Sequence, residues 1–218
     1  MMKKGQLVTI LLPAIIMLEG SCTGDSSNEG IVDCEQEYIQ IVHKIENRCT
    51  DPRNSVTVLA DLETNLSNVL QACPNHSGLR VLMADIQVSS GKNVSALGYI
   101  RQALEIDPDN AEAIHVKGVI LSLEGDVDES LALMEHSLDM EPNNIDFLVN
   151  YCSTLESFSR YEEAIRVCSR ALTKENAPAV VFYIRGRAYE GIGQKGNARL
   201  DFERARERGF NEEAKPLN

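Results

Sequence analysis

From residue 77 onward, small and large side chains recur along the chain with a period of 34 residues. Four windows align in register: 77–110, 111–144, 145–178 and 179–212. Residues of low volume fill the eighth position (Ala84, Gly118, Cys152 and Gly186) and the twentieth (Ala96, Ser130, Ala164 and Ala198). A fixed period of this length indicates one supersecondary unit repeated in tandem.

Each window has the pattern of two helices joined by a short turn. Low volume at the eighth and twentieth positions would let two antiparallel helices approach closely, with bulkier side chains beside the contact. Gly91, Gly125 and Gly193 stand at the fifteenth position, where a first helix would end, and Ser159 replaces glycine in the third window. A proline near the window's end would stop the second helix. The pattern therefore predicts an all-α fold.

This 34-residue pattern resembles the tetratricopeptide repeat, most clearly in residues 98–110 and 159–172. The resemblance implies a right-handed α-solenoid of antiparallel helix pairs with about four regular repeats over 77–212. Upstream, residues 31–76 have helical periodicity but a weaker register, and we expect an irregular N-terminal helix pair that caps the array. Residues 213–218 are expected to form a tail.

The first residues have the pattern of a secretory signal. A cationic start precedes the mostly apolar residues 7–18, a stretch shorter than the roughly 20 residues that a membrane-spanning helix needs. Residues 18–22 resemble the lipobox of bacterial lipoproteins, although Glu19 stands where that family has an aliphatic residue. We expect a signal peptide at 1–21, lipidation (palmitate) at Cys22 and a flexible tether at 22–30. Ordinary cleaved secretion and an uncleaved anchor are the alternatives.

The other cysteines suggest a disulfide. Cys34 lies near the start of the first expected helix and Cys73 near the end of the second, and antiparallel pairing would bring these ends together. We expect a Cys34–Cys73 bond in an oxidising compartment. Cys49 is expected to stay a thiol. Cys152 and Cys168 are interpreted as buried thiols used for packing, with a second disulfide as the alternative.

Composition removes several classes of function. A formal net charge of −12 and 5% aromatic residues disfavour nucleic-acid binding, which uses a cationic surface and stacking side chains. The four histidines fit no HExxH motif, and no CxxC pair occurs. We therefore expect no catalytic residues, no metal and no cofactor, and predict that the protein is not an enzyme.

In the tetratricopeptide family the first helix of each pair lines a concave groove that binds a protein or peptide segment. The groove positions carry an apolar strip edged by carboxylates, which suits an extended or helical partner. Packing of the same valines and isoleucines inside the fold is the alternative. The expected groove residues are Val81, Asp85, Glu112, His115, Val116, Val119, Val149, Asn150, Ser153, Tyr183, Ile184 and Arg187.

These patterns lead to one functional hypothesis and two alternatives. The hypothesis is a non-catalytic, membrane-tethered lipoprotein scaffold that faces the periplasm. Thr23 after Cys22, in place of Asp, favours the outer membrane as its location. This scaffold is similar in kind to the pilotins of pilus and secretion assembly. The alternatives are a soluble secreted adaptor and an enzyme with its site around His115. The oligomeric state is left open.

Overall fold

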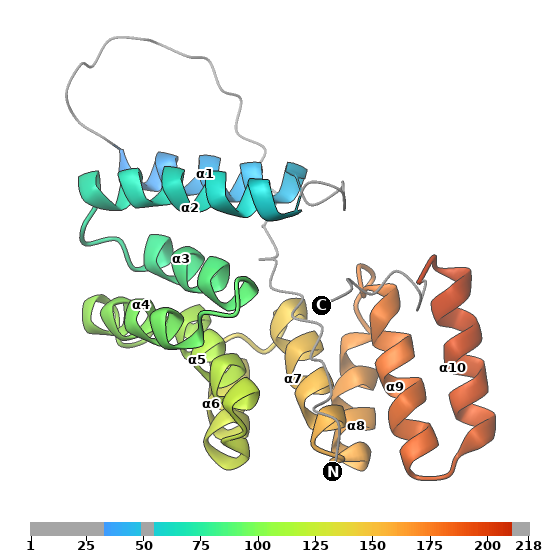
Figure 1. Cartoon of the computed structure of the whole chain (residues 1–218). Helices are drawn as coiled ribbons and strands as arrows, with labels where there is room; N and C mark the ends of the chain where they lie inside the picture. The colour runs from blue at the N-terminus through green and yellow to red at the C-terminus, as the bar shows by residue number, and fades with distance from the viewer. Residues whose placement is uncertain (1–32, 49–54, 211–218) are drawn as a thin grey trace. The chain divides into compact units, whose positions relative to one another are not determined.

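The computed structural model describes residues 33–48 and 55–210, and this part of the chain is built of helices alone (Figure 1). The expected signal peptide, tether and tail lie outside the described residues, as do Cys22 and Cys49. The predicted all-α fold of helix pairs is confirmed. The helices are α1 (Cys34–Arg48), α2 (Ser55–Ala72), α3 (Ser77–Ser89), α4 (Asn93–Ile106), α5 (Ala111–Glu124), α6 (Val127–Met140), α7 (Ile145–Ser157), α8 (Tyr161–Ala171), α9 (Ala179–Gly191) and α10 (Lys195–Glu207).

The chain divides into two compact units, and the division falls inside α5. Among the described residues, the first unit comprises 33–48 and 55–116, and the second comprises 117–210.

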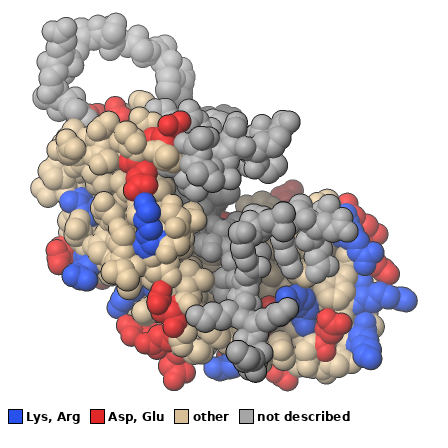
Figure 2. All heavy atoms as spheres, viewed as in Figure 1, with Lys and Arg blue, Asp and Glu red and all other residues tan. Residues whose placement is uncertain are grey.

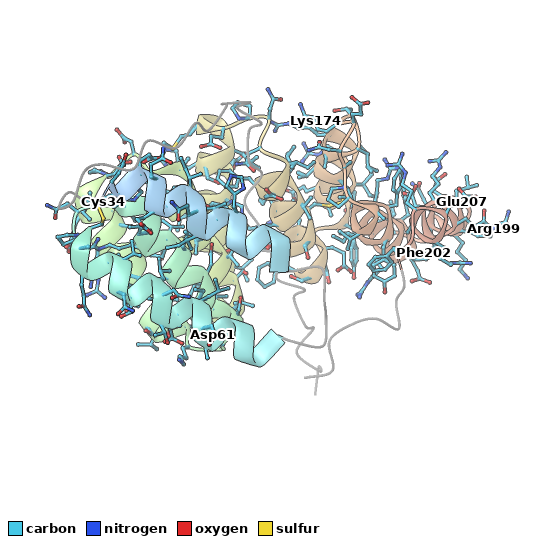
Figure 3. All side chains as sticks on the ribbon, turned by 90° about the horizontal axis from the view of Figure 1, so that it is seen from above. Cys34, Asp61, Lys174, Arg199, Phe202 and Glu207 are labelled. Atoms are coloured by element: carbon cyan, nitrogen blue, oxygen red, sulfur yellow. A yellow bond between two sulfur atoms is a disulfide. The ribbon has the colours of Figure 1, made fainter. Side chains whose placement is uncertain are left out.

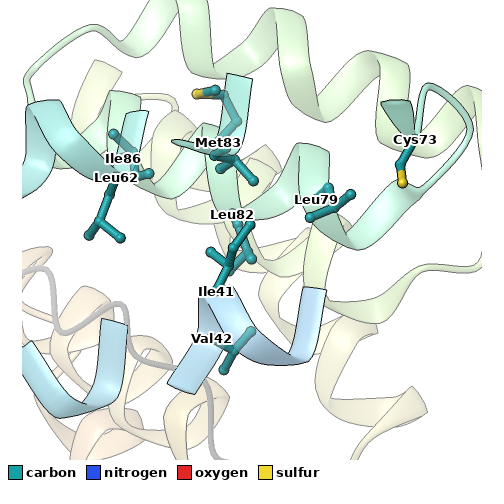
Figure 4. Packing of buried hydrophobic residues seen from close by; sticks show 9 residues of the cluster. Ile41, Val42, Leu62, Cys73, Leu79, Leu82, Met83 and Ile86 are labelled. Carbon is teal, nitrogen blue, oxygen red and sulfur yellow. The ribbon is translucent and has the colours of Figure 1, made fainter. Parts of the chain in front are cut away.

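In the first unit, α2 packs against both α1 and α3, and α3 packs against α4. Its buried cluster draws side chains from α1, α2 and α3 and from the residue that follows α2 (Figure 4). Burial of each such side chain contributes about 1.5–3 kcal/mol. The cluster consists of Ile41, Val42, Leu62, Leu66, Cys73, Leu79, Leu82, Met83 and Ile86.

A disulfide joins the two ends that antiparallel pairing of α1 and α2 brings together. It links Cys34, the first residue of α1, to Cys73, the residue after α2, with their Cα atoms 5.7 Å apart (Figure 3). This is the pair expected from the sequence. By closing the chain across 39 residues, the bond restricts the unfolded state, an effect of about 4 kcal/mol in the chain-entropy model.

In the second unit, the small residues of the repeat pattern lie at close contacts between paired helices. A Cβ atom added to Gly118 of α5 would lie 3.1 Å from the carbonyl oxygen of Ser130 on α6. One added to Gly186 of α9 would lie 2.7 Å from the ring of Phe202 and 3.3 Å from the carbonyl oxygen of Ala198, both on α10. The eighth and twentieth positions therefore meet as the pattern predicts, and the twenty-fourth position fills the space beside them.

An ion pair also holds this unit together. Arg185 of α9 donates from Nε to Oδ2 of Asp201 at 2.7 Å and from a terminal nitrogen to Oδ1 at 2.9 Å. Its other terminal nitrogen donates to the Ser169 hydroxyl of α8 at 3.0 Å. The hydrogen bond to Asp201 raises the pKa of Arg185. Asp201 is only 2% exposed, so one guanidinium joins three successive helices through a desolvated carboxylate.

Cys152 of α7 and Cys168 of α8 form a second disulfide, so the favoured interpretation of two buried thiols is wrong. Their Cα atoms are 5.4 Å apart, within the range that a disulfide bridges. Facing packing positions on paired helices bring the two side chains together. The pattern of small residues did not reveal the disulfide, because a thiol sulfur and a disulfide sulfur fill similar space.

The turns between paired helices need backbone angles that glycine adopts without strain. Gly91, Gly125 and Gly193 have φ angles of 71°, 90° and 77°. Ser159 occupies the same position between α7 and α8 with φ 60°. No other non-glycine residue in the described part of the chain has a positive φ angle. Its side chain adds strain that the other three turns avoid.

We expect Ser159→Gly to raise the free energy of unfolding by about 0.5–1 kcal/mol, because relief of the left-handed strain exceeds the added entropy of the unfolded chain. Urea denaturation followed by circular dichroism measures the change. Gly125→Ala is the matched control and should lower stability by about 1 kcal/mol. An equal loss in both variants would show that Ser159 is not strained.

Candidate protein-binding surface

The apolar groove residues are covered within the fold. Valine or isoleucine side chains on the first helices of the pairs are 0–7% exposed, so they supply core packing more than open surface. Contact with a partner would be left to the polar residues beside them. The covered residues are Val81 on α3, Val116 and Val119 on α5, Val149 on α7 and Ile184 on α9.

The polar groove residues divide by exposure. Asp85, Glu112, Ser153 and Tyr183 are half-buried, and Arg187 is exposed. His115 and Asn150 are buried, at 1% and 7% exposure. Within each unit, the accessible part of the expected groove is therefore polar, which favours recognition through charge and hydrogen bonds.

In the first unit, Tyr38 of α1 lies against the start of α3. Its ring stacks on the His76 imidazole with centroids 5.1 Å apart. His76 caps α3 by accepting a hydrogen bond from the Leu79 amide, and its Nε2 atom lies 3.2 Å from the Glu35 carboxylate. A Cβ atom on Gly78 would lie 3.0 Å from the Tyr38 ring. Glycine thus allows the tyrosine to pack close to the α3 backbone.

Three carboxylates act electrostatically on this tyrosine. Burial raises its pKa, and the negative charges of Glu112, Glu35 and Asp85 raise it further. The phenol therefore keeps its proton and remains a hydrogen-bond donor at physiological pH. Glu112 lies in the first turn of α5, Asp85 on α3 and Glu35 on α1, so three helices of one unit contribute to this shift of the Tyr38 pKa.

Asp85 of α3 is an acid whose own pKa is strongly shifted. Burial raises its pKa well above the usual value, and repulsion from Glu112 adds to the effect. Its Oδ1 atom is shielded from solvent and has no hydrogen-bond partner. A carboxylate oxygen in this state destabilises the fold unless a proton or a bound cation compensates for it.

His115 is buried on α5, and burial lowers its pKa to about 3. The imidazole is therefore neutral in the folded protein at physiological pH. This shift has burial as its cause, which a packed core histidine also shows. It does not by itself indicate catalysis.

In the second unit, two groove residues make contacts with neighbouring helices. Arg187 of α9 lies 3.0 Å from the Glu156 carboxylate of α7, which links the first helices of successive pairs. Tyr183 packs instead toward the last helix, with ring centroids 4.7 Å from Phe210 and 5.6 Å from Phe202. Arg187 thus stays accessible, whereas Tyr183 contributes to closing the end of this unit.

The outer face of α10 is strongly charged. Arg199 and Glu207 extend away from the helix into solvent (Figure 3), and basic side chains gather over this element (Figure 2). Such a face suits a terminal helix that no further repeat covers. The basic residues there are Lys195, Arg199, Arg204, Arg206 and Arg208.

Two features of the described residues bear on other functions. Across residues 33–48 and 55–210, no three His, Cys, Asp or Glu side chains are grouped so that they could hold a metal ion. None of the helices in the same part of the chain combines the length and apolar character needed to cross a bilayer.

Sequence reasoning did not find Tyr38, Glu35 or His76. These residues belong to or adjoin the irregular helix pair, where the 34-residue register gives no position to read. The glycine at position 78 was the one sequence feature that could have pointed to them, because it leaves room for a side chain close to the α3 backbone. Its meaning becomes clear only in the structure, where the Tyr38 ring of α1 packs there.

Known proteins share this architecture. Residues 111–144 match the family model described as tetratricopeptide repeat, and these are the bounds of the second sequence window. Together with the helix pairs, the match gives the described chain a fold of the tetratricopeptide-repeat solenoid type. Curated relatives include Tetratricopeptide repeat protein 16 of Mus musculus, 28% identical over 102 residues, which are 44% of this chain and 13% of that protein. The chain spans between 9% and 19% of the length of the curated relatives it matches.

Several solved structures are similar in fold. PilW, described as a widely conserved type IV pilus biogenesis factor, has a TM-score of 0.67 at 19% identity, over 84% of this chain and 79% of that one. PilF of Pseudomonas aeruginosa has a TM-score of 0.65 at 12% identity, over 82% and 77%. A MamA structure has a TM-score of 0.57 at 16% identity, over 85% and 97%. At these identities the likeness concerns the fold alone.

The buried His115 predicts a pH-dependent stability. Its pKa is about 3 when folded and about 6.5 when unfolded, so the unfolded state binds more protons between these values. Its stabilising contribution is complete above pH 6.5 and declines as the pH falls toward 3. Relative to His115→Gln, the wild type should lose about 2 kcal/mol of unfolding free energy between pH 7 and pH 5.

Urea denaturation at the two pH values tests this expectation. His136→Gln, the same substitution on the exposed side of α6, is the control. Comparison with a variant isolates His115 from Asp85, whose raised pKa acts in the opposite direction. Parallel pH profiles for wild type and His115→Gln would rule out a buried neutral imidazole.

Proposed function

We propose that this protein is a non-catalytic scaffold that binds a segment of a protein partner along the first helices of its repeats. The observation that carries the proposal is the tandem two-helix module, whose first helices keep polar side chains accessible beside a covered apolar core. Asp85 and Glu112 serve this purpose in the first unit, and Ser153 and Arg187 in the second. Such positions provide direction and specificity to a bound segment.

We further propose that a lipid on Cys22 tethers the scaffold to a membrane, with residues 22–30 as the spacer. The cationic start, the short apolar segment and the lipobox-like residues before Cys22 support this proposal. Two disulfides support an oxidising compartment such as the periplasm. Fold similarity to a type IV pilus biogenesis factor makes envelope, pilus or secretion assembly the pathway to test first, with the outer membrane as the site.

Two alternatives differ in what they require. A soluble secreted adaptor would use the same surface without a lipid on Cys22. An enzyme would need substrate to reach His115, which is 1% exposed and has its pKa shifted by burial. The half-buried and exposed polar positions of the first helices favour a binding surface over a catalytic site.

A photo-crosslinking experiment in the native cells tests surface and tether together. We expect a benzophenone amino acid at position 153 to crosslink one defined partner, because this half-buried position on α7 belongs to the proposed surface. The wild-type protein should incorporate labelled palmitate and partition into detergent, whereas Cys22→Ala should do neither. Mass spectrometry of the adduct and phase partitioning provide the readouts.

The same probe at Val94 is the matched control, because this side chain on α4 is 87% exposed and lies on a second helix. Equal crosslinking from positions 94 and 153 would contradict a surface restricted to the first helices. Absence of palmitate from the wild type, with crosslinking retained, would favour the soluble adaptor.

A further inference from the structure

The two disulfides of the described chain differ in how easily a thiol can reach them. Cys34 is half-buried at the start of α1 and Cys73 is 2% exposed, so the first disulfide has one accessible end (Figure 3). Cys152 and Cys168 are both 0% exposed. Thiol–disulfide exchange requires a thiolate to reach a sulfur atom of the bond. In the folded protein, exchange is therefore open to the first disulfide through Cys34 and closed to the second.

Few buried side chains attach α1 to the rest of the first unit. Among residues 34–43 of this helix, whose side chains are described, Ile41 and Val42 are buried and the others are half-buried or exposed. Tyr38 adds its ring stack on His76. A helix of 15 residues is marginally stable in water without such contacts. The covalent bond at the first residue of α1 is therefore a main part of its attachment.

The surface that α1 covers is apolar. Ile41 and Val42 belong to the buried cluster of the first unit, in which Leu66 of α2 and Leu79 of α3 are 0% exposed (Figure 4). Without α1, the cluster would lose Ile41 and Val42, and apolar side chains of α2 and α3 would become open to solvent. Contiguous apolar surface of this kind is rare on soluble proteins and marks sites of interaction. Release of α1 would therefore change what this unit presents to other molecules.

We propose that the Cys34–Cys73 disulfide is a redox switch, which holds α1 as a cover over α2 and α3 and releases it when a dithiol reduces the bond. One thiolate of the dithiol attacks the Cys34 sulfur, forms a mixed disulfide and expels Cys73 as a thiolate. The second thiolate of the dithiol attacks its partner sulfur in the mixed disulfide and expels Cys34. The dithiol is thereby oxidised to a disulfide, and its two protons pass to the two cysteines.

Timed reduction of the full chain in detergent tests which disulfide opens first. Free thiols are blocked with N-ethylmaleimide and dithiothreitol is added. The thiols released after increasing times are alkylated with iodoacetamide and located by peptide mass spectrometry. We expect Cys34 and Cys73 to be released about tenfold faster or more than Cys152 and Cys168. Equal rates for the two pairs, or faster release of Cys152 and Cys168, would overturn the inference.

Hydrogen exchange then tests whether opening of the bond releases α1. With the first disulfide reduced and the second intact, the backbone amides of α1 should exchange about tenfold faster or more than in the oxidised protein. The amides of α9, in the unit that keeps its disulfide, are the control and should change less than about twofold. Unchanged exchange in α1 would show that packing alone holds this helix, and it would refute the switch.

The double variant Cys34→Ser/Cys73→Ser is the matched comparison. Its α1 amides should exchange fast without reductant, and dithiothreitol should not change them further. A further increase with dithiothreitol would assign the effect on α1 to another bond and contradict the inference. If the double variant does not fold, the oxidised and reduced wild type still decide between a switch and a fixed cover.

Discussion

Close contact between the two helices of a pair is the constraint on which the described structure depends. A Cβ atom added to Gly186 would lie 2.7 Å from the Phe202 ring and 3.3 Å from a backbone carbonyl oxygen of the neighbouring helix. A Cβ atom added to Gly118 would likewise meet the backbone of α6. Backbones can approach this closely only where side-chain volume is absent, and a larger side chain next to the gap then fills the remaining space. The 34-residue period therefore records a steric requirement.

This packing determines what the first helices can offer a partner. Val81 and Val149 are turned into the core, because closely packed pairs cover the apolar side of each first helix. What stays accessible on these helices is polar. Strain is tolerated at Ser159, because two well-packed helices fix the turn between them.

Sequence patterns predicted the helix pairs and the glycine turns, because both follow from local sterics that recur at each window. They also pointed to Cys34 with Cys73, since antiparallel helices place those ends together. The sequence patterns could not predict how exposed the groove residues are. A repeat position gives the direction of a side chain but not how much of it neighbours cover, as Val116 shows. Tyr38 was missed because it lies outside the repeats, and its place beside His76 depends on how an irregular pair packs.

Stability measurements on glycine variants test the central claim most directly. Gly186 and Gly196 both lie within helices, but an added Cβ atom meets Phe202 at the first position and open space at the second. If close approach governs the fold, Gly186→Ala lowers the free energy of unfolding by about 1–3 kcal/mol, whereas Gly196→Ala raises it by up to about 1 kcal/mol. Equal stabilisation by both substitutions would contradict the account.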